Sequence, residues 1–256
     1  MKVVILAGGL GTRLSEETSS IPKPMVRIGG LPILIHIMRH YYFHGFKEFV
    51  ILLGYKGEVI KEYFLNYPFN ASDFTLKQKS NEKTLSDFSP EDWTISFVDT
   101  GQDTMTGGRI KRAEKIIGDE DFMLTYGDGV SDIDLNKLEN FHKAHNKIAT
   151  MTCIQPEEKR FGIIESKDDF VTSFQEKPSE TDSWINGGFF IFKKELFSLL
   201  KNDETFLERE PFQALVGKKQ LMTYKHDGFW KCMDTLRDKL ELQSNWDSGN
   251  PAWKKW

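Results

Sequence analysis

Short apolar runs alternate with helical segments from the first residues of the chain, and this alternation limits the fold more than any other feature. The runs fall at residues 2–7, 49–53, 94–98, 122–126 and 149–154, and each has the length of a buried strand. Between them, the spacing predicts helices over residues 32–42, 58–64, 109–117 and 135–145. Repeated strand–helix–strand units predict an α/β fold, with a mostly parallel sheet flanked by helices and right-handed crossovers.

The second part of the chain has a different texture. After Pro156, alternating segments at residues 170–174 and 189–192 predict a mixed or antiparallel extension of the sheet, and residues 236–246 predict a closing helix. We expect one domain over residues 1–256, with a core over about 1–155 and an extension with the C-terminal part over about 156–256. Residues 66–92 are polar and weakly patterned, which predicts an extended excursion with some strand, an arm onto a neighbouring subunit.

The composition fits a soluble protein with a large core and no nucleic-acid partner. The chain has 256 residues, 39% of them apolar, and a formal net charge of −4. Binding to a phosphate backbone needs a clustered excess of Lys and Arg, which this charge does not favour. Cys153 and Cys232 form no CxxC pair, so we predict two structural thiols in a reducing cytosol. We see no signal peptide and no run near the roughly 18 apolar residues of a membrane span, so we expect a cytoplasmic protein without a membrane partner.

A glycine-rich segment directly follows the first apolar run. Three glycines at positions 8, 9 and 11 let the backbone approach an anion closely, and Thr12 and Arg13 add side-chain donors. The segment predicts a phosphate-binding loop, with a tight turn that binds no ligand as the structural alternative. The dinucleotide fingerprint GxGxxG fails because Leu14 stands where the third glycine belongs, and the P-loop pattern is absent from the chain.

Two further residues suit phosphate chemistry. Lys23 stands between Pro22 and Pro24, which predicts a stiff extended segment that holds the ammonium at one defined point. Asp128 follows the run at 122–126, at the strand end where ligands of open α/β sheets gather. Magnesium takes one or two carboxylates together with substrate phosphates, so Asp128 is a candidate metal ligand, with an ordinary Asp turn as the alternative.

Motifs spread over nearly the whole chain resemble those of the sugar-nucleotide pyrophosphorylase family. The GGxGTR signature stands at residues 8–13 and a KPM segment at 23–25. The match continues through YGDG at 126–129, FQEKP at 174–178, NGG at 186–188 and MDT at 233–235, and it includes TGGR at 106–109 and the tail PAWKKW at 251–256. The chain departs from the family pattern at Arg27, Leu31 and Ile35, positions that bear on sugar choice and subunit contacts.

The resemblance implies a Rossmann-like nucleotidyltransferase sheet and an enzyme that transfers the cytidylyl group of CTP to α-D-glucose 1-phosphate. The products would be pyrophosphate and CDP-glucose, a precursor for deoxysugars and O antigen. The resemblance also implies Mg²⁺ as the cofactor and a homohexamer. Three alternatives stay open: a different phosphorylated acceptor, a catalytically silent nucleotide-sensing subunit and, more distantly, a dinucleotide-dependent oxidoreductase.

The same resemblance implies roles for particular residues. Arg13, Lys23 and Asp128 would be catalytic, and Asp128 with Asp234 would bind the metal. The nucleotide would contact Leu6, Ala7, Gly8, Gly9, Leu10, Gly11, Thr12, Arg13, Lys23, Thr104, Arg109 and Gly127. The sugar phosphate would contact Gly162, Glu176, Lys177, Asn186 and Gly187. The structural alternatives are a helix N-cap for Asp234, a charged turn for Glu176 and Lys177, and a strand bend for Asn186 and Gly187.

Arg109 supports a hypothesis for base selectivity. Cytosine presents O2 and N3 as acceptors, whereas N3–H of uracil donates, so the donor-only guanidinium would favour CTP over UTP. Gly107 and Gly108 would let the backbone approach the base, and Thr104 would reach the base or the ribose. The alternative roles for Arg109 are a helix cap and a phosphate contact.

Overall fold

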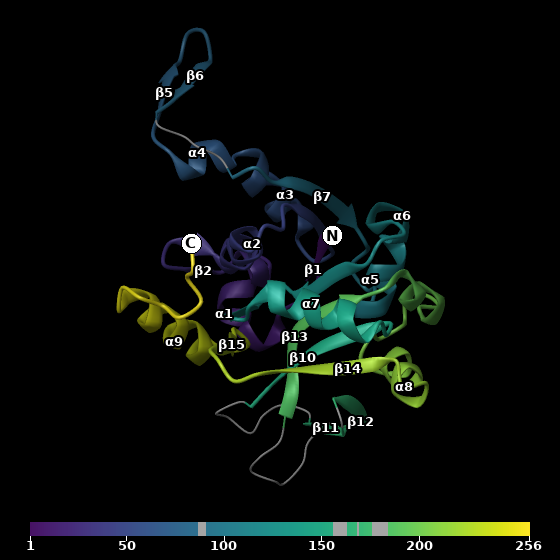
Figure 1. Ribbon diagram of the computed structural model, residues 1–256. Helices are drawn as coiled ribbons and strands as arrows, with labels where there is room; N and C mark the ends of the chain where they lie inside the picture. Colours follow the sequence, from purple (N-terminus) through teal and green to yellow (C-terminus); the bar gives the residue numbers. More distant parts are fainter. Residues whose placement is uncertain (87–90, 156–162, 168, 176–183) are drawn as a thin grey trace.

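A nine-stranded sheet runs through the protein (Figure 1). The computed structural model describes residues 1–86, 91–155, 163–167, 169–175 and 184–256. Four neighbouring strands of the sheet run parallel, in the order β7 (Thr94–Asp99), β4 (Glu48–Leu53), β1 (Lys2–Ala7) and β8 (Phe122–Tyr126). They confirm the first four predicted strands, and no boundary differs by more than one residue.

The other strands of the sheet are added mainly in the antiparallel sense. β13 (Trp184–Phe192) lies antiparallel to β8, and it also pairs with β10 (Ala149–Ile154) and β11 (Ile163–Lys167). β12 (Phe170–Gln175) and β14 (Leu221–His226) complete the sheet, and only β10 and β14 are parallel to each other in this part. The predicted mixed extension is therefore confirmed, and β10 belongs to it rather than to the parallel block.

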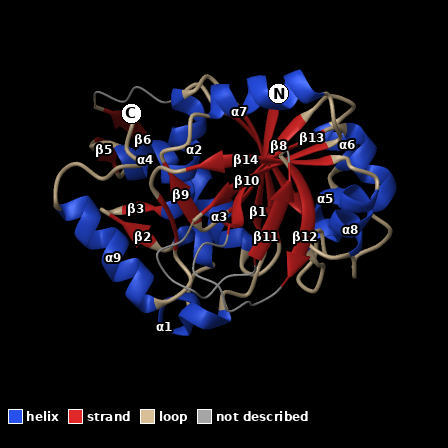
Figure 2. Cartoon of the chain, turned by 60° about the horizontal axis from the view of Figure 1, so that its bottom comes forward, coloured by secondary structure: helices blue, strands red, loops and turns tan. Residues whose placement is uncertain are grey.

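Helices cover both faces of the sheet (Figure 2). One face carries α2 (Ile33–Phe43), α3 (Gly57–Leu65), α7 (Leu135–His145) and α9 (Leu236–Asp247). The other carries α5 (Thr106–Arg112), α6 (Glu114–Ile117), α8 (Glu210–Gly217) and the 3₁₀ helix η3 (Lys194–Leu199). No helix in the described part of the chain is long and apolar enough to cross a bilayer.

The central strand β1 shows how the two faces hold the sheet. Val3 and Ile5 pack into the core of the first face, and Val4 and Leu6 into that of the second. Burying such side chains contributes about 1.5–3 kcal/mol each relative to exposure. Because every position from Val3 to Ala7 packs against one face or the other, the end of β1 is a rigid base for the glycine-rich loop that follows.

The region over residues 109–117 differs from its prediction. It forms two helices, α5 and α6, that meet at Ala113, and α5 begins at Thr106. The amide of Ala113 donates to the carbonyl of Ile110, an i→i+3 bond that tightens the chain between the two helices. This early start brings Thr106 and Arg109 into one short helix.

Short elements near the strand ends complete the fold. They are η1 (Thr12–Leu14), α1 (Ser15–Thr18), η2 (Lys23–Met25), β2 (Arg27–Ile28), β3 (Leu31–Pro32), β9 (Gly129–Ser131) and β15 (Trp230–Cys232). β9 and β15 pair with each other outside the main sheet, as do β2 and β3.

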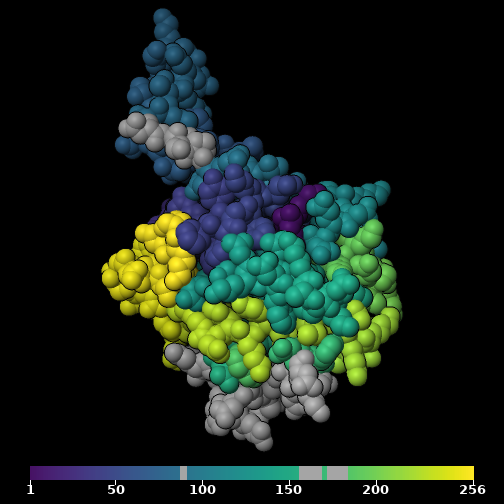
Figure 3. Space-filling model, viewed as in Figure 1, coloured from purple at the N-terminus to yellow at the C-terminus, as the bar shows by residue number. Residues whose placement is uncertain are grey.

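An arm projects from the body of the protein (Figure 1, Figure 3). It consists of α4 (Tyr67–Ala71) and a hairpin of β5 (Phe74–Lys77) and β6 (Glu82–Leu85), so the predicted excursion with some strand is confirmed. Its base is anchored through Glu91, which accepts from Tyr67 Oη at 3.0 Å and from Arg39 Nε at 2.8 Å.

Candidate active site

A cleft of about 340 Å³ opens at the carboxyl ends of β1 and β8. Leu6 is the register partner of Tyr126, so the residues that follow the two strands meet at one edge of the sheet. The amide of Gly127 continues the pairing by donating to the carbonyl of Leu6 at 3.0 Å. The cleft is lined by Leu6, Ala7, Gly8, Gly9, Gly11, Thr12, Arg13, Lys23, Pro24, Thr104, Met105, Thr106, Arg109, Tyr126, Gly127, Asp128 and Phe206.

The structure thus brings together the residues that were predicted to contact the nucleotide, with one exception. Leu10 does not line the cleft, and its side chain is half exposed. A contact from Leu10 would therefore have to come from its backbone. The binding role of the set stays a prediction, and the geometry supplies the cavity that this prediction requires.

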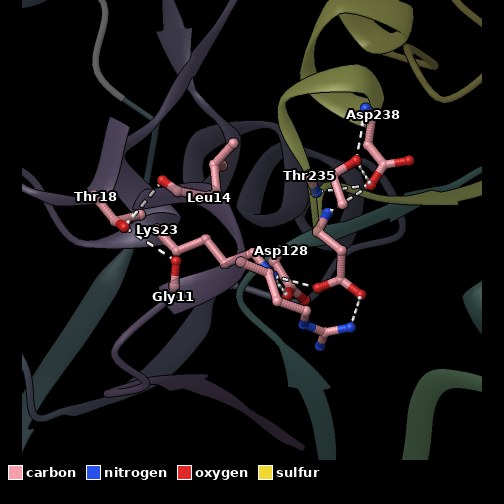
Figure 4. A network of polar contacts seen from close by, with 9 residues as sticks. Gly11, Leu14, Thr18, Lys23, Asp128, Thr235 and Asp238 are labelled. Carbon is pink, nitrogen blue, oxygen red and sulfur yellow. Dashed lines mark hydrogen bonds and ion pairs between the residues drawn. The ribbon is translucent and has the colours of Figure 1, made fainter. Parts of the chain in front are cut away.

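The loop after β1 has a left-handed backbone at one position, which favours glycine. Gly11 has a φ of 64°, and a Cβ at this residue would lie 2.9 Å from the side chain of Thr18. The hydroxyl of Thr18 lies 3.0 Å from the carbonyl oxygens of both Gly11 and Leu14 (Figure 4). This contact closes the loop and helps to fix its shape.

Lys23 is held between two carboxylates (Figure 4). Its Nζ lies 2.5 Å from Oδ2 of Asp128 and 2.6 Å from Oδ1 of Asp234, and its side chain is only 12% exposed. Burial disfavours the ammonium, but attraction to Asp128 and Asp234 outweighs it and raises the pKa of Lys23 above its ordinary value. Lys23 lies in the 3₁₀ turn η2, rather than in the extended segment expected from its prolines.

The β9–β15 ladder brings the two carboxylates together. Gly129 pairs with Cys232, and the amide of Met233 donates to the carbonyl of Asp128 at 2.8 Å. The residue after Met233 is Asp234, whose Oδ2 lies 3.0 Å from Nη1 of the largely exposed Arg13. Two aspartates far apart in the sequence therefore flank the same cation.

Asp234 is not the N-cap that the local sequence allows. Thr235 caps α9, in a capping box with Asp238. The backbone amide of Asp234 donates to Asp238 Oδ2 at 3.0 Å, while its own carboxylate faces Lys23 and Arg13. The carboxylate of Asp234 thus pairs with two cations that line the cleft instead of capping α9.

The carboxylate pair is compatible with magnesium. Both groups already meet one cation, and hard carboxylate oxygens are the ligands that Mg²⁺ prefers. The described part of the chain holds no cluster of three or more His, Cys, Asp or Glu residues suited to a metal, so a metal here would need substrate phosphates and water as further ligands. Cys153 and Cys232 are free and buried, and burial raises the pKa of the Cys232 thiol beside this pair.

Arg109, the predicted base reader, is hydrogen-bonded to the protein itself. Its Nη1 donates to the carbonyls of Leu53 and Gly101 and to the hydroxyl of Thr100, at 2.6–3.1 Å. Its Nη2 donates to the carbonyls of Gly8 and Gln102 at 3.1 and 3.0 Å. Both terminal nitrogens are therefore engaged by protein acceptors, and Arg109 joins the end of β4 to the loops that follow β1 and β7.

Burial and close packing reinforce this structural role. Arg109 is 5% exposed, and burial lowers the pKa of its guanidinium, which still stays charged as arginine does in proteins. A Cβ at Gly8 would lie 2.3 Å from Nη1, so the loop needs glycine there to admit the side chain. Arg109 lines the cleft and its hydrogen bonds support the loop, whereas its contact with the base stays a prediction.

Gly107 and Gly108 pack closely against the loop before α8, whereas the sequence had suggested that they face the base. A Cβ at Gly107 would lie 2.8 Å from the carbonyl oxygen of Thr205, and one at Gly108 would lie 2.6 Å from Cα of Asp203. The two glycines therefore admit the loop before α8, and not a base. Thr104 remains in the cleft and is buried.

The predicted sugar-phosphate residues are only partly described. Gly162, Glu176 and Lys177 lie outside the described residues. Asn186 and Gly187 lie in β13, where the β10–β13 register shifts and Gly188 has a φ of 78°, so the strand is irregular here as the structural alternative predicts. Asn186 nevertheless reaches toward the cleft, because its Nδ2 donates to the hydroxyl of Tyr126 at 3.4 Å.

The cleft also contains residues that were absent from the predicted set. Tyr126 and Thr106 belong to motifs that carried the resemblance, so the sequence offered a signal for both. Met105 and Phe206 had no such signal, since each reaches the cleft only through the docking of α5 against the loop before α8.

Comparison with known proteins assigns the family. The family model for nucleotidyl transferases matches residues 2–246. The chain belongs to the nucleotidyl transferase family. This assignment removes the oxidoreductase alternative, and it makes the cleft the candidate active site of the enzyme.

Individual relatives narrow the comparison. The glucose-1-phosphate cytidylyltransferase of Salmonella typhimurium is 51% identical to this chain over 257 residues, and the alignment covers 100% of both proteins. The probable glucose-1-phosphate cytidylyltransferase of Bacillus subtilis is 46% identical over the same full length. UDP-glucose pyrophosphorylase from Acinetobacter baumannii has a structure that aligns with a TM-score of 0.80 at 18% identity, covering 98% of this chain and 95% of that one. The last likeness concerns the fold alone and confirms the predicted α/β architecture.

Proposed function

We propose that the enzyme transfers the cytidylyl group of CTP to α-D-glucose 1-phosphate and releases pyrophosphate. The full-length likeness to glucose-1-phosphate cytidylyltransferases supports the choice of substrates. The observation that carries the chemistry is the fixed, charged Lys23 beside a glycine-rich loop in a cleft at the strand ends. The product CDP-glucose would serve as a precursor for deoxysugars and O antigen.

The reaction needs positioning and positive charge rather than a protein nucleophile. An ionised oxygen of glucose 1-phosphate attacks the α-phosphorus of CTP and forms the new P–O bond. The bond from this phosphorus to the oxygen of the β-phosphate breaks, and pyrophosphate leaves with the electron pair. Because both substrates are anionic, Lys23 and Arg13 would stabilise the charge on the phosphoryl oxygens.

Asp128 and Asp234 would hold Mg²⁺ together with phosphate oxygens of the nucleotide. When bound, the ion would neutralise phosphate charge and orient the triphosphate. Lys23 occupies the place between the two carboxylates before substrate arrives. The incoming phosphates would give its ammonium new partners and so release the carboxylates for the metal.

The arm supports assembly into an oligomer, for which we propose a homohexamer in the cytoplasm. A two-stranded hairpin is marginally stable by itself in water, and β5 and β6 stand away from the body (Figure 3). Contact with another subunit would cover the hairpin. This accounts for a projecting arm on an otherwise well-packed chain.

Pyrophosphate release measures the proposed activity directly. Purified protein is incubated with Mg²⁺, one of CTP, UTP, dTTP or GTP, and one of several sugar 1-phosphates. We expect rapid release only with CTP and glucose 1-phosphate, its loss in Lys23→Ala, and wild-type rates in the surface control Lys61→Ala. Turnover of CTP with another acceptor would support the alternative substrate, and no turnover with any pair would support a silent sensing subunit.

A further inference from the structure

One carboxylate, that of Glu208, binds two hydroxyl groups in the wall of the cleft. Thr106 Oγ1 lies 2.7 Å from its Oε2, and Tyr126 Oη lies 2.6 Å from its Oε1. Thr106 and Tyr126 line the cleft, whereas Glu208 is set back from it. Burial and the charge of Glu208 raise the pKa of Tyr126 well above its ordinary value, so the phenol keeps its proton.

This arrangement fixes the direction of the hydrogen bonds. A carboxylate only accepts, and each hydroxyl has a single proton, so both protons point to Glu208. Thr106 Oγ1 also accepts from the amide of Leu207 at 2.9 Å, which leaves it one lone pair. Toward the cleft, the two hydroxyl oxygens can therefore accept a hydrogen bond but cannot donate one.

The loop that carries Glu208 is firmly docked, so this polarity is built into the resting protein. Met105 N donates to the carbonyl of Asp203 at 2.8 Å, and Gly107 N donates to that of Thr205 at 2.9 Å. The loop sits so close to α5 that side chains at positions 107 and 108 would clash with it. The wall is preorganised before a ligand enters.

Thr106 is the better placed of the two acceptors for a nucleobase. The hydroxyl of Tyr126 already accepts from Asn186 Nδ2. Thr106 shares its side of the cleft with Phe206, whose ring offers a flat apolar face, with the guanidinium of Arg209 at 4.1 Å from the ring centre. Aromatic faces stack well on bases, and the acceptor at Thr106 would then meet a polar edge of the base.

Cytosine and uracil differ in the exocyclic group that they would present to this acceptor. Cytosine has the N4 amine, which donates, and uracil has the O4 oxygen, which accepts. We propose that Glu208 selects cytosine over uracil by fixing the Thr106 hydroxyl as an acceptor for the N4 amine. The inference rests on the proposed function, and it gives to Thr106 and Glu208 the selectivity that the sequence had suggested for Arg109.

The test compares kcat/KM for CTP and UTP at saturating glucose 1-phosphate. In Glu208→Gln, the new amide donates to one hydroxyl, whose own proton can then turn toward the cleft and meet O4 of uracil. An unpaired buried polar group lowers affinity by a factor of about 10 to 100, so we expect the CTP/UTP ratio to fall by about that factor. Glu204→Gln, an exposed carboxylate of the same loop, should keep the wild-type ratio.

Substitutions of Thr106 keep the test decisive even where Glu208→Gln folds poorly. Thr106→Val removes the acceptor at nearly constant volume and should lower the CTP/UTP ratio of kcat/KM. Thr106→Ser keeps the hydroxyl and should keep the wild-type ratio. If the wild type prefers CTP and neither Glu208→Gln nor Thr106→Val changes that preference, the inference is overturned but the proposed function is not. A raised KM for glucose 1-phosphate at a constant CTP/UTP ratio would also overturn the inference, because the acceptors would then face the sugar. A wild type that uses UTP as well as CTP would overturn the proposed function and this selection with it.

Discussion

Replacing Lys23 by methionine separates the electrostatic role of its ammonium from the packing of its stem. The variant keeps an unbranched apolar chain but leaves Asp128 and Asp234 facing each other, with side chains 25% and 8% exposed. Breaking a buried ion pair costs about 3–5 kcal/mol, and the partial exposure of Asp128 should reduce the cost to about 2–3 kcal/mol. At about 2–4 °C for each kcal/mol in a chain of this size, the melting temperature should fall by about 5–10 °C.

Magnesium should distinguish the two proteins in the absence of nucleotide. In the wild type, the ammonium lies between the carboxylates, so Mg²⁺ alone should change the melting temperature little. In Lys23→Met, Asp128 loses the ammonium and Asp234 keeps only its ion pair with the largely exposed Arg13, so Mg²⁺ should restore part of the lost stability by binding the folded state. Turnover of Lys23→Met should fall by about 10²–10³-fold relative to the wild type, because one transition-state cation is lost.

Thermal unfolding with and without Mg²⁺, at constant ionic strength, measures both effects. Lys61→Met serves as the control, because Lys61 is exposed on α3 and its loss should change neither value. The reasoning is refuted if Lys23→Met melts like the wild type. Equal stabilisation of the wild type and the variant by Mg²⁺ would show that Lys23 and the metal do not compete for the carboxylates.

Three further predictions concern the metal, the buried arginine and the arm. The double variant Asp128→Asn, Asp234→Asn should lose activity and also Mn²⁺ binding in the presence of CTP, measured by electron paramagnetic resonance; retained magnesium-dependent turnover would contradict the metal assignment. Arg109→Lys keeps the charge but cannot reach five acceptors, so it should lower stability by about 2–4 kcal/mol and raise the KM for CTP, as measured by urea unfolding and initial rates. Replacing residues 73–86 by a short Gly–Ser linker should lower the molar mass in light scattering without unfolding the monomer, and an unchanged mass would exclude the arm from the assembly.

The sequence by itself was enough to predict the four parallel strands, the position of the glycine-rich loop and the family. These features depend on local chemistry. The run at residues 2–7 has the pattern of a strand buried on both faces, and Gly11 adopts a left-handed backbone that favours glycine. Such signals are written in adjacent residues, so the strand boundaries and the position of the loop could be predicted almost to the residue.

The tertiary structure alone decided which polar groups meet. The ladder of β9 and β15 sets Asp128 beside Asp234, and the loop before α8 docks on α5 to bring Glu208 to Thr106. The five acceptors of Arg109 come from two loops and the end of strand β4, a combination that no local sequence pattern predicts. The physical reason is that apolar periodicity reports burial, whereas a buried donor takes whichever acceptors the packed loops place around it.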